Sequence, residues 1–194
     1  MEPRKQIRAM SRECKGERGS MLIELLISMV VLAIGLGGVL AVLVSSVLTN
    51  SKAGKDTTST MVAEHVLEQI SAQPANAVAN LSITDCAGTV RNIATAGAAL
   101  GAGSGVNGGN GANLTNNAII DWTQAYAGVP ANYAMQYVSC GTGGRQVTYD
   151  VRWNVIKMTN YTRMVIVSAR PANSNTVGGL KFVVPVNLRT IGGM

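Results

Sequence analysis

The sequence is poor in charged and aromatic residues. Charged side chains make up 13% of its 194 residues and aromatic side chains 4%, where about a quarter of a soluble protein is charged. The low charge indicates that part of the chain lies outside water, and the lack of rings disfavours a surface on which nucleic-acid bases stack. The length suits one ordinary domain, or a small domain with an appendage, and excludes most large enzyme architectures.

Residues for catalysis and metal binding are also scarce. The only histidine, His65, stands near Glu64 and Glu68 at helical spacing, whereas zinc sites need three or four ligands. A solvated helix face explains this group. No nucleophile is spaced with a general base. We therefore expect no catalytic residue, no metal site and no cofactor, and a protein that is not an enzyme.

The charge that is present is concentrated at the N-terminus. Residues 1–19 hold six cations and three anions, and the following run from Leu25 to Ser51 is uncharged. The apolar part of that run, Leu25 to Leu48, is about 36 Å long as a helix, which spans a bilayer. The positive-inside rule places the N-terminus in the cytoplasm and the remainder outside. A secretory signal peptide has a shorter apolar core of about 7–15 residues; a plain signal anchor is the stronger alternative.

An acidic residue lies just inside the apolar segment. Glu24 stands four positions after Ser20, and a carboxylate near the end of a membrane helix costs about 1–3 kcal/mol unless it lies among the headgroups or has a partner. Residues 18–24 read R-G-S-M-L-I-E. This resembles the type IV prepilin signature, in which a short basic leader ends in glycine and glutamate is the fifth residue after the cleavage site.

The resemblance implies several functional residues. The prepilin peptidase would cleave between Gly19 and Ser20, and Ser20 would become the N-methylated first residue, although the family most often has Phe-Thr where this chain has Ser20-Met21. Glu24 would pair with the terminal amine of a neighbouring subunit, so that its desolvation is offset only in the correct register. The stretch V-L-A-I-G-L from Val31 is similar to the PilV-type minor pilins.

Three glycines follow in this segment. Gly35, Gly37 and Gly38 each weaken a helix by about 1 kcal/mol relative to alanine. One interpretation is close helix packing, with Gly37 and Ala41 as a small-xxx-small pair. The other is that the segment loses helical structure when the subunit leaves the bilayer for a filament.

The rest of the chain predicts an α+β protein. Val62, Val66 and Ile70 recur every four residues, which continues the helix amphipathically over residues 51–74, to Pro74. A helix over residues 20–73 would be about 81 Å long unless Gly54 interrupts it. Residues 75–145, rich in Gly, Ala and Asn, are expected to form a variable loop region, and a short helix is predicted over residues 118–127. The G-x-G-x-x-G run at residues 103–108 has no preceding strand, so no dinucleotide site is expected.

Strands are predicted over residues 146–194. Apolar residues alternate with polar ones from Val147 to Val155, which predicts a strand with one buried and one wet face. Residues 157–160 read as a turn, 162–169 and 180–188 as antiparallel strands, and 171–179 as a loop, with Pro185 at an edge or bulge. The resemblance implies the pilin fold, a long N-terminal helix packed on this sheet, with residues 1–19 as the leader and 20–50 as the membrane and assembly helix.

Two further features concern the exported part. Removal of the leader removes Cys14, which leaves Cys86 and Cys140 as a pair in an oxidising compartment; a disulfide between them is expected, with two buried thiols as the alternative. Seven cations lie at or beyond residue 145 with only Asp150 to oppose them, and could form a basic sheet face or act as solvated residues and edge guards. They are Arg145, Arg152, Lys157, Arg163, Arg170, Lys181 and Arg189.

The resemblance implies a structural role. We expect a minor pilin that waits as a single-pass precursor in the inner membrane and joins a type IV pilus, near the tip or in the complex that starts assembly. Its partners would be other pilins, the prepilin peptidase and methyltransferase, and the assembly platform. The alternatives are a minor pseudopilin of a type II secretion system, and an adhesive or DNA-binding tip subunit that uses residues 76–117 or the basic face.

Overall fold

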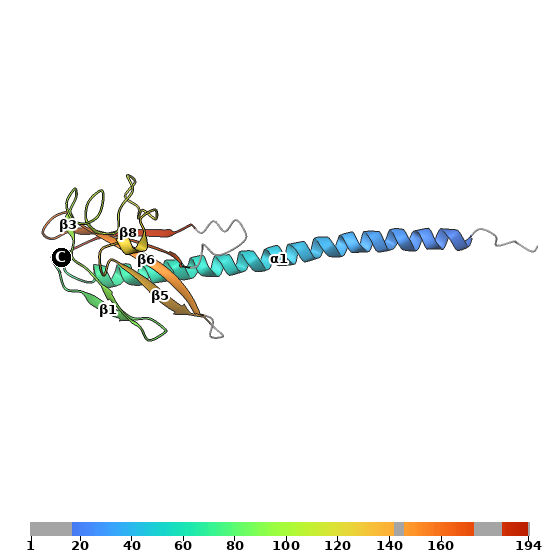
Figure 1. Cartoon of the computed structure of the whole chain (residues 1–194), viewed down its shortest axis with the longest axis horizontal. Coiled ribbons are helices and arrows are strands. Elements are labelled where there is room, and N and C mark those ends of the chain that lie inside the picture. Colours follow the sequence, from blue (N-terminus) through green and yellow to red (C-terminus); the bar gives the residue numbers. More distant parts are fainter. Residues whose placement is uncertain (1–16, 142–145, 173–183, 194) are drawn as a thin grey trace, which may run out of the picture. The chain divides into compact units, whose positions relative to one another are not determined.

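The computed structural model describes residues 17–141, 146–172 and 184–193. The chain divides into two units, Met1–Asn50 and Ser51–Met194. Helix α1, Glu17–Ser71, contains the described residues of the first unit and continues into the second (Figure 1). The predictions for Cys14, for most of the leader and for most of the 171–179 loop concern residues outside these ranges.

Helix α1 runs through its internal glycines without a break. It has no proline, so every backbone amide after the first turn can donate, and Gly54 does not interrupt it. Thr57 and Thr58 bond back to the carbonyls of Ala53 and Gly54 at 3.0 and 2.9 Å, which satisfies these hydroxyls within the helix. The helix ends at Ser71, three residues before Pro74.

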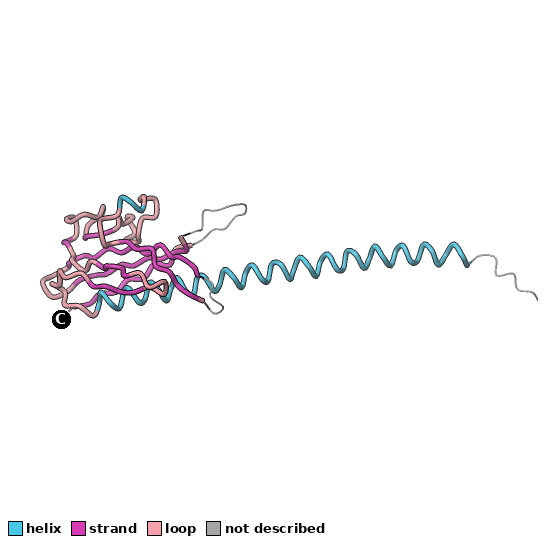
Figure 2. The backbone as a smooth tube through the Cα atoms, turned by 60° about the horizontal axis from the view of Figure 1, so that its bottom comes forward, coloured by secondary structure: helices cyan, strands magenta, loops and turns pink. Residues whose placement is uncertain are grey.

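In the second unit, one face of α1 packs on a sheet. Val62, Val66 and Ile70 are 6%, 0% and 0% exposed, as the four-residue spacing predicts, and belong to one core with Trp153 and Val165. Burial of these side chains contributes about 1.5–3 kcal/mol each to the free energy of unfolding. The arrangement is α+β, with the apolar face of a long helix on a mixed sheet (Figure 2).

The main sheet has six strands, built around a central long strand. The strands are β3 (Ala98–Ala99), β4 (Asn110–Gly111), β5 (Ala134–Cys140), β6 (Gln146–Lys157), β7 (Arg163–Pro171) and β8 (Val186–Gly192). One edge of β6 pairs with β7, which pairs with β8; the other edge pairs in turn with β5, β4 and β3. Only β3 is parallel to β6. A separate antiparallel pair, β1 (Leu81–Thr84) and β2 (Val90–Ile93), precedes it.

The alternating pattern predicts strand β6 correctly, but the burial that it predicts for the polar face of the strand is wrong. Tyr149, Val151 and Trp153 face the core as expected, at 0–1% exposure. The opposite face was expected to be wet, yet Arg152 and Asn154 are 2% and 0% exposed. The reason is that residues 100–130, hereafter the covering segment, lie over that face: Asn154 donates to the carbonyls of Gly108 and Ala112 at 3.1 and 2.8 Å.

Three other expectations need correction. Residues 118–125 form turns and bends with one bridge at Ile120, and the 3-10 helix η1 (Tyr126–Gly128) follows, so no α-helix lies there. The last strand lies at Val186–Gly192 and starts directly after Pro185, which cannot donate to a ladder. The loose region expected over residues 75–145 contributes β3, β4 and β5 to the sheet. Its glycines allow this close approach: a Cβ on Gly105 would lie 2.6 Å from Asn154 Nδ2.

Candidate functional site

The N-terminal part of α1 holds the residues expected to direct processing and assembly. Gly19 and Ser20 lie in the helical backbone near its start, and Glu24 follows Ser20 by four residues, about 6 Å along the axis. The side chain of Glu24 is exposed, and its backbone carbonyl accepts a bond of 2.8 Å from Ser28 Oγ. Among the residues that the structure describes, no ion pair involves Glu24. The carboxylate is therefore open to a partner from another molecule.

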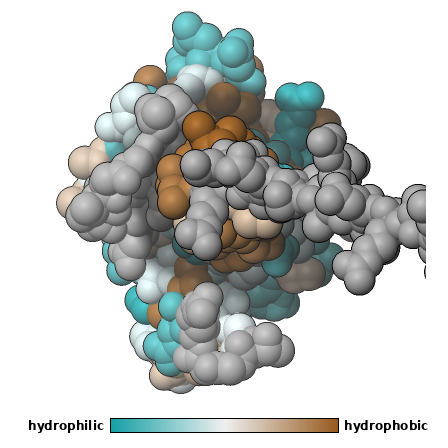
Figure 3. All heavy atoms as spheres, turned by 90° about the vertical axis from the view of Figure 1, so that its right-hand side faces the viewer, coloured by the Kyte–Doolittle hydropathy of each residue, from teal (hydrophilic) through white to brown (hydrophobic). Residues whose placement is uncertain are grey.

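An apolar surface surrounds this carboxylate. Every large hydrophobic side chain from Met21 to Leu48 is between 54% and 72% exposed. The space-filling view also shows hydrophobic residues, coloured brown, at the surface of the protein (Figure 3). In the described part of the chain, α1 is the one helix long and apolar enough to cross a membrane. A surface of this size that stays in contact with water would lead to aggregation, so lipid or other protein must cover it.

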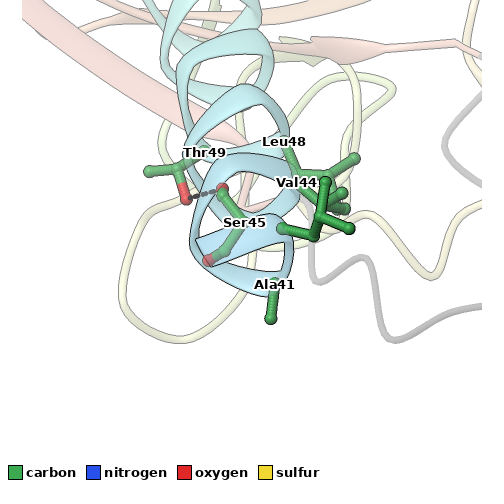
Figure 4. A pocket seen from close by; sticks show the side chains of 6 residues that line it. Ala41, Val44, Ser45, Leu48 and Thr49 are labelled. Atoms are coloured by element: carbon green, nitrogen blue, oxygen red, sulfur yellow. Dashed lines mark hydrogen bonds between the residues drawn. The ribbon is translucent and has the colours of Figure 1, made fainter. Parts of the chain in front are cut away.

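A shallow groove lies on this surface (Figure 4). Ala41 and Ser45 are its small residues, with Leu40, Val44 and Leu48 beside them. Thr49 Oγ1 donates to the Ser45 carbonyl at 2.9 Å, so its hydroxyl proton is used within the helix. The groove is compatible with close approach of another helix.

The glycine segment is helical and uncrowded. Gly35, Gly37 and Gly38 lie within α1, and a Cβ at each would meet no atom within 4 Å. No contact inside the described chain therefore requires glycine at these positions. Packing against another helix, and loss of helical structure during assembly, both stay predictions.

The expected disulfide is present in the second unit. Cys86 and Cys140 are bonded, with a Cα–Cα distance of 5.9 Å. Cys86 follows β1 and Cys140 ends β5, so the bridge ties the β1–β2 pair to the main sheet. The Cys86 amide also donates to the Val138 carbonyl at 3.3 Å. The bond joins the region rich in Gly and Ala to the sheet, as the cysteine count predicts.

A buried carboxylate organises the turn beside this disulfide. Asp85 is 4% exposed; its Oδ1 accepts the amides of Ala87 and Thr89 at 3.1 and 2.8 Å, and its Oδ2 accepts Arg91 Nε at 3.4 Å. Burial alone raises the pKa of the Asp85 carboxyl, but the bonds from Thr89 and Arg91 outweigh it and hold the pKa below its usual value.

The prediction that the C-terminal cations form one basic face of the sheet is wrong. Arg163 is 1% exposed and lies on the core side, where it donates to the carbonyls of Thr95, Ile70 and Gln73. Arg152, on the opposite side, is 2% exposed and paired with Asp150 at 2.8 Å. Arg145 and Lys181 lie outside the described residues.

An arginine–tryptophan cluster, which the sequence analysis did not predict, joins the covering segment to the sheet. The guanidinium carbons of Arg152 and Arg170 lie 4.6 and 4.2 Å from the centroid of the Trp122 ring. Trp122 Nε1 donates to Ser168 Oγ at 3.0 Å, and Arg152 Nη1 donates to the Gln124 carbonyl. The cluster holds the covering segment on the sheet through cation–π contacts and hydrogen bonds. No local sequence pattern predicts this cluster, because the cations that contact Trp122 lie about 30–50 residues further along the chain.

Other chemistry is not assembled among the described residues. His65 lies exposed on α1 with Glu64 and Glu68, and no group of three metal-ligating side chains occurs in the ranges described. In the G-x-G-x-x-G run, the amides of Gly105 and Gly108 donate to the carbonyls of Gly109 and Gly105 at 3.0 and 3.2 Å. These amides are used within the loop, so they are not free to bind a phosphate.

Comparison with known proteins gives no match to this chain: no family model, no curated protein and no solved structure matches it.

Proposed function

We propose that this protein is a minor pilin of a type IV pilus, related in its N-terminal segment to the PilV-type subunits. The observation that carries the proposal is Glu24. It is the single ionisable residue between Met21 and Ser51, it is exposed in a helix with an uncovered apolar surface, and it follows the Gly19–Ser20 junction at the spacing of the prepilin signature.

The proposed mechanism begins with cleavage between Gly19 and Ser20. The cut creates an α-amine at Ser20, which is then methylated and remains basic. In a bundle of such helices, the Glu24 carboxylate of an incoming subunit pairs with the terminal amine of its neighbour. An uncompensated charge in an apolar bundle costs several kcal/mol, so subunits in the wrong register are rejected. The protein then acts as a structural subunit and not as an enzyme.

The architecture supports this proposal at the level of the fold. A pilin has a long N-terminal helix whose second half packs on a sheet, with a variable region between them. Here α1 continues into the second unit and packs on the sheet through Val62, Val66 and Ile70. We place the precursor in the inner membrane, with its sheet domain outside the cytoplasm, and its partners are other pilins, the processing peptidase and the assembly platform.

The test is replacement of Glu24. Glu24→Ala should leave membrane insertion intact, measured by resistance to alkaline extraction, and should abolish recovery of the protein in sheared filaments. Glu68→Ala is the matched control, because it also removes one exposed carboxylate from α1 and should leave incorporation unchanged. Normal incorporation of Glu24→Ala would contradict the pairing mechanism.

A minor pseudopilin of a type II secretion system is the alternative, because it would share the leader, the helix and Glu24. Cross-linking through the α1 helix separates the two: capture of pilus subunits favours the pilin, and capture of secretion pseudopilins favours the alternative. An adhesive or DNA-binding tip subunit is less well supported, since two of the expected basic residues, Arg152 and Arg163, are buried. Salt-dependent retention on DNA tests it.

A further inference from the structure

Two lysines follow the uncharged segment of α1 directly. Lys52 and Lys55 are the first charged residues after Glu24. Both are exposed, and their spacing of three residues places them on the same side of the helix. The ion pairs in the described part of the chain are Arg91–Asp85 and Arg152–Asp150. Asp56, one turn beyond Lys52, therefore forms no ion pair with it there.

The length of the uncharged run sets the depth of these lysines. Leu25 to Ser51 would be about 40 Å long as a helix, and a bilayer is about 40–45 Å thick with its headgroups included. When Glu24 lies at one headgroup layer, Lys52 and Lys55 lie at the other. Their long apolar stems can follow the acyl chains while the ammonium groups reach the phosphates.

Three hydroxyl groups at this level are already used within the helix. Thr49 donates its hydroxyl proton to the Ser45 carbonyl, and Thr57 and Thr58 donate theirs to carbonyls one turn earlier. The two ammonium groups are the charged donors at this end of the segment, and a charged donor bonds a phosphate more strongly than a neutral one such as the Asn50 amide. A zwitterionic lipid would bring its own cation close to them, whereas an anionic headgroup would not.

We propose that Lys52 and Lys55 bind the headgroups of anionic phospholipids in the leaflet opposite the cytoplasm. This inference rests on the membrane insertion that the proposed function includes. Anionic lipid held here fixes the depth of α1 in the bilayer, and these contacts must break when the subunit is extracted into a filament. Each lysine near a charged lipid surface favours the anionic lipid by about fivefold.

The experiment uses the full chain in nanodiscs that contain phosphatidylcholine and phosphatidylglycerol. A photoreactive group is placed on the headgroup of either lipid, and cross-links to residues 49–56 are counted by mass spectrometry. The wild type should favour the phosphatidylglycerol probe at least about fivefold. Lys52→Gln with Lys55→Gln should reduce the ratio to about one. The matched control, Lys157→Gln with Arg189→Gln, also removes two cations and should keep the wild-type ratio.

The outcomes separate this inference from the proposed function. A ratio near one in the wild type, or an unchanged ratio in the lysine variant, would overturn the lipid site. Displacement of the probe by inorganic phosphate, but not by chloride at equal ionic strength, would overturn the assignment to lipid. Failure of the wild type to enter nanodiscs would instead overturn membrane insertion, on which the proposed function depends. Cations of the N-terminal tract label other positions, so they do not affect the ratio at residues 49–56.

Discussion

Replacement of Arg163 tests how the second unit is held together. The guanidinium is 1% exposed and donates to three backbone carbonyls: Ile70, Gln73 at 2.7 Å and Thr95 at 3.3 Å. Two of these carbonyls, Ile70 and Gln73, lie at the C-terminal end of α1 and its exit, where the intrahelical donors run out; the Ile70 carbonyl also accepts the Gln73 amide at 3.1 Å. Burial lowers the pKa of Arg163, and no described carboxylate lies within ion-pair distance of it.

The magnitude follows from the carbonyls that lose their donor. Arg163→Met keeps an apolar side chain of moderate size but leaves the Gln73 and Thr95 carbonyls without their donor, at about 1 kcal/mol each. The Ile70 carbonyl keeps the Gln73 amide as a donor. The expected loss in the free energy of unfolding is about 2 kcal/mol, which for a chain of this size corresponds to a decrease in Tm of about 4–8 °C.

The assay is thermal unfolding of the full chain in detergent, followed by tryptophan fluorescence, because Trp153 is fully buried in the same core. Arg189→Met is the control, since Arg189 is exposed on β8 and its loss should change Tm by less than about 2 °C. Arg163→Lys should recover only part of the loss, because one ammonium group cannot match a planar guanidinium across three carbonyls. A decrease below about 2 °C for Arg163→Met would refute this account of the helix terminus.

Three further predictions concern the second unit. Replacement of Cys86 and Cys140 by serine should lower the free energy of unfolding by about 4 kcal/mol, measured by denaturant unfolding, since the bridge closes a loop with a sequence separation of 54; a loss under about 1 kcal/mol would contradict it. The lowered pKa of Asp85 stabilises the fold above the unfolded pKa, and this stability should be lost as the pH falls through the folded pKa; an Asp85→Asn variant with the same acid dependence as the wild type would argue against it. Asn154→Asp should expose the Gly108 and Ala112 carbonyls, with faster hydrogen exchange in residues 101–112, because a carboxylate cannot donate to them; unchanged exchange rates would show that Asn154 does not hold the segment.

The sequence predicts the elements that have a clear period. The apolar run and the spacing of Val62, Val66 and Ile70 predict α1 within a few residues, because helix formation depends on neighbours three and four residues apart. The alternation from Val147 to Val155 predicts β6 for the same reason. The even cysteine pair predicts the disulfide that the structure contains.

The errors arise where long-range packing decides the structure. The covering segment has no period of its own, so nothing local shows that it lies on the second face of the sheet and buries Arg152 and Asn154. Strand β5 alternates only over Met135 to Tyr137 before Val138 breaks the pattern, and its pairing with β6 supplies the rest. The helix expected around Trp122 is replaced by turns, because the ring is held by Arg152 and Arg170 from other strands.

The residues of the candidate site fall into two classes. Gly19, Ser20 and Glu24 are defined by a motif in the sequence, and the structure adds that Glu24 is exposed on an apolar helix. Arg163 and the Trp122 cluster are invisible to a motif, since their partners lie up to 93 residues away. The proposed assembly function thus rests on local sequence, whereas the stability of the sheet domain is a property of the folded chain.

The intact mass of the protein recovered from sheared filaments reports cleavage, methylation and the disulfide together. We expect a chain that starts at Ser20, carries one added methyl group and lacks two hydrogens because of the Cys86–Cys140 bond. Filament-incorporated protein that retains residues 1–19 would contradict this prediction, because no new amine would then stand four residues before Glu24.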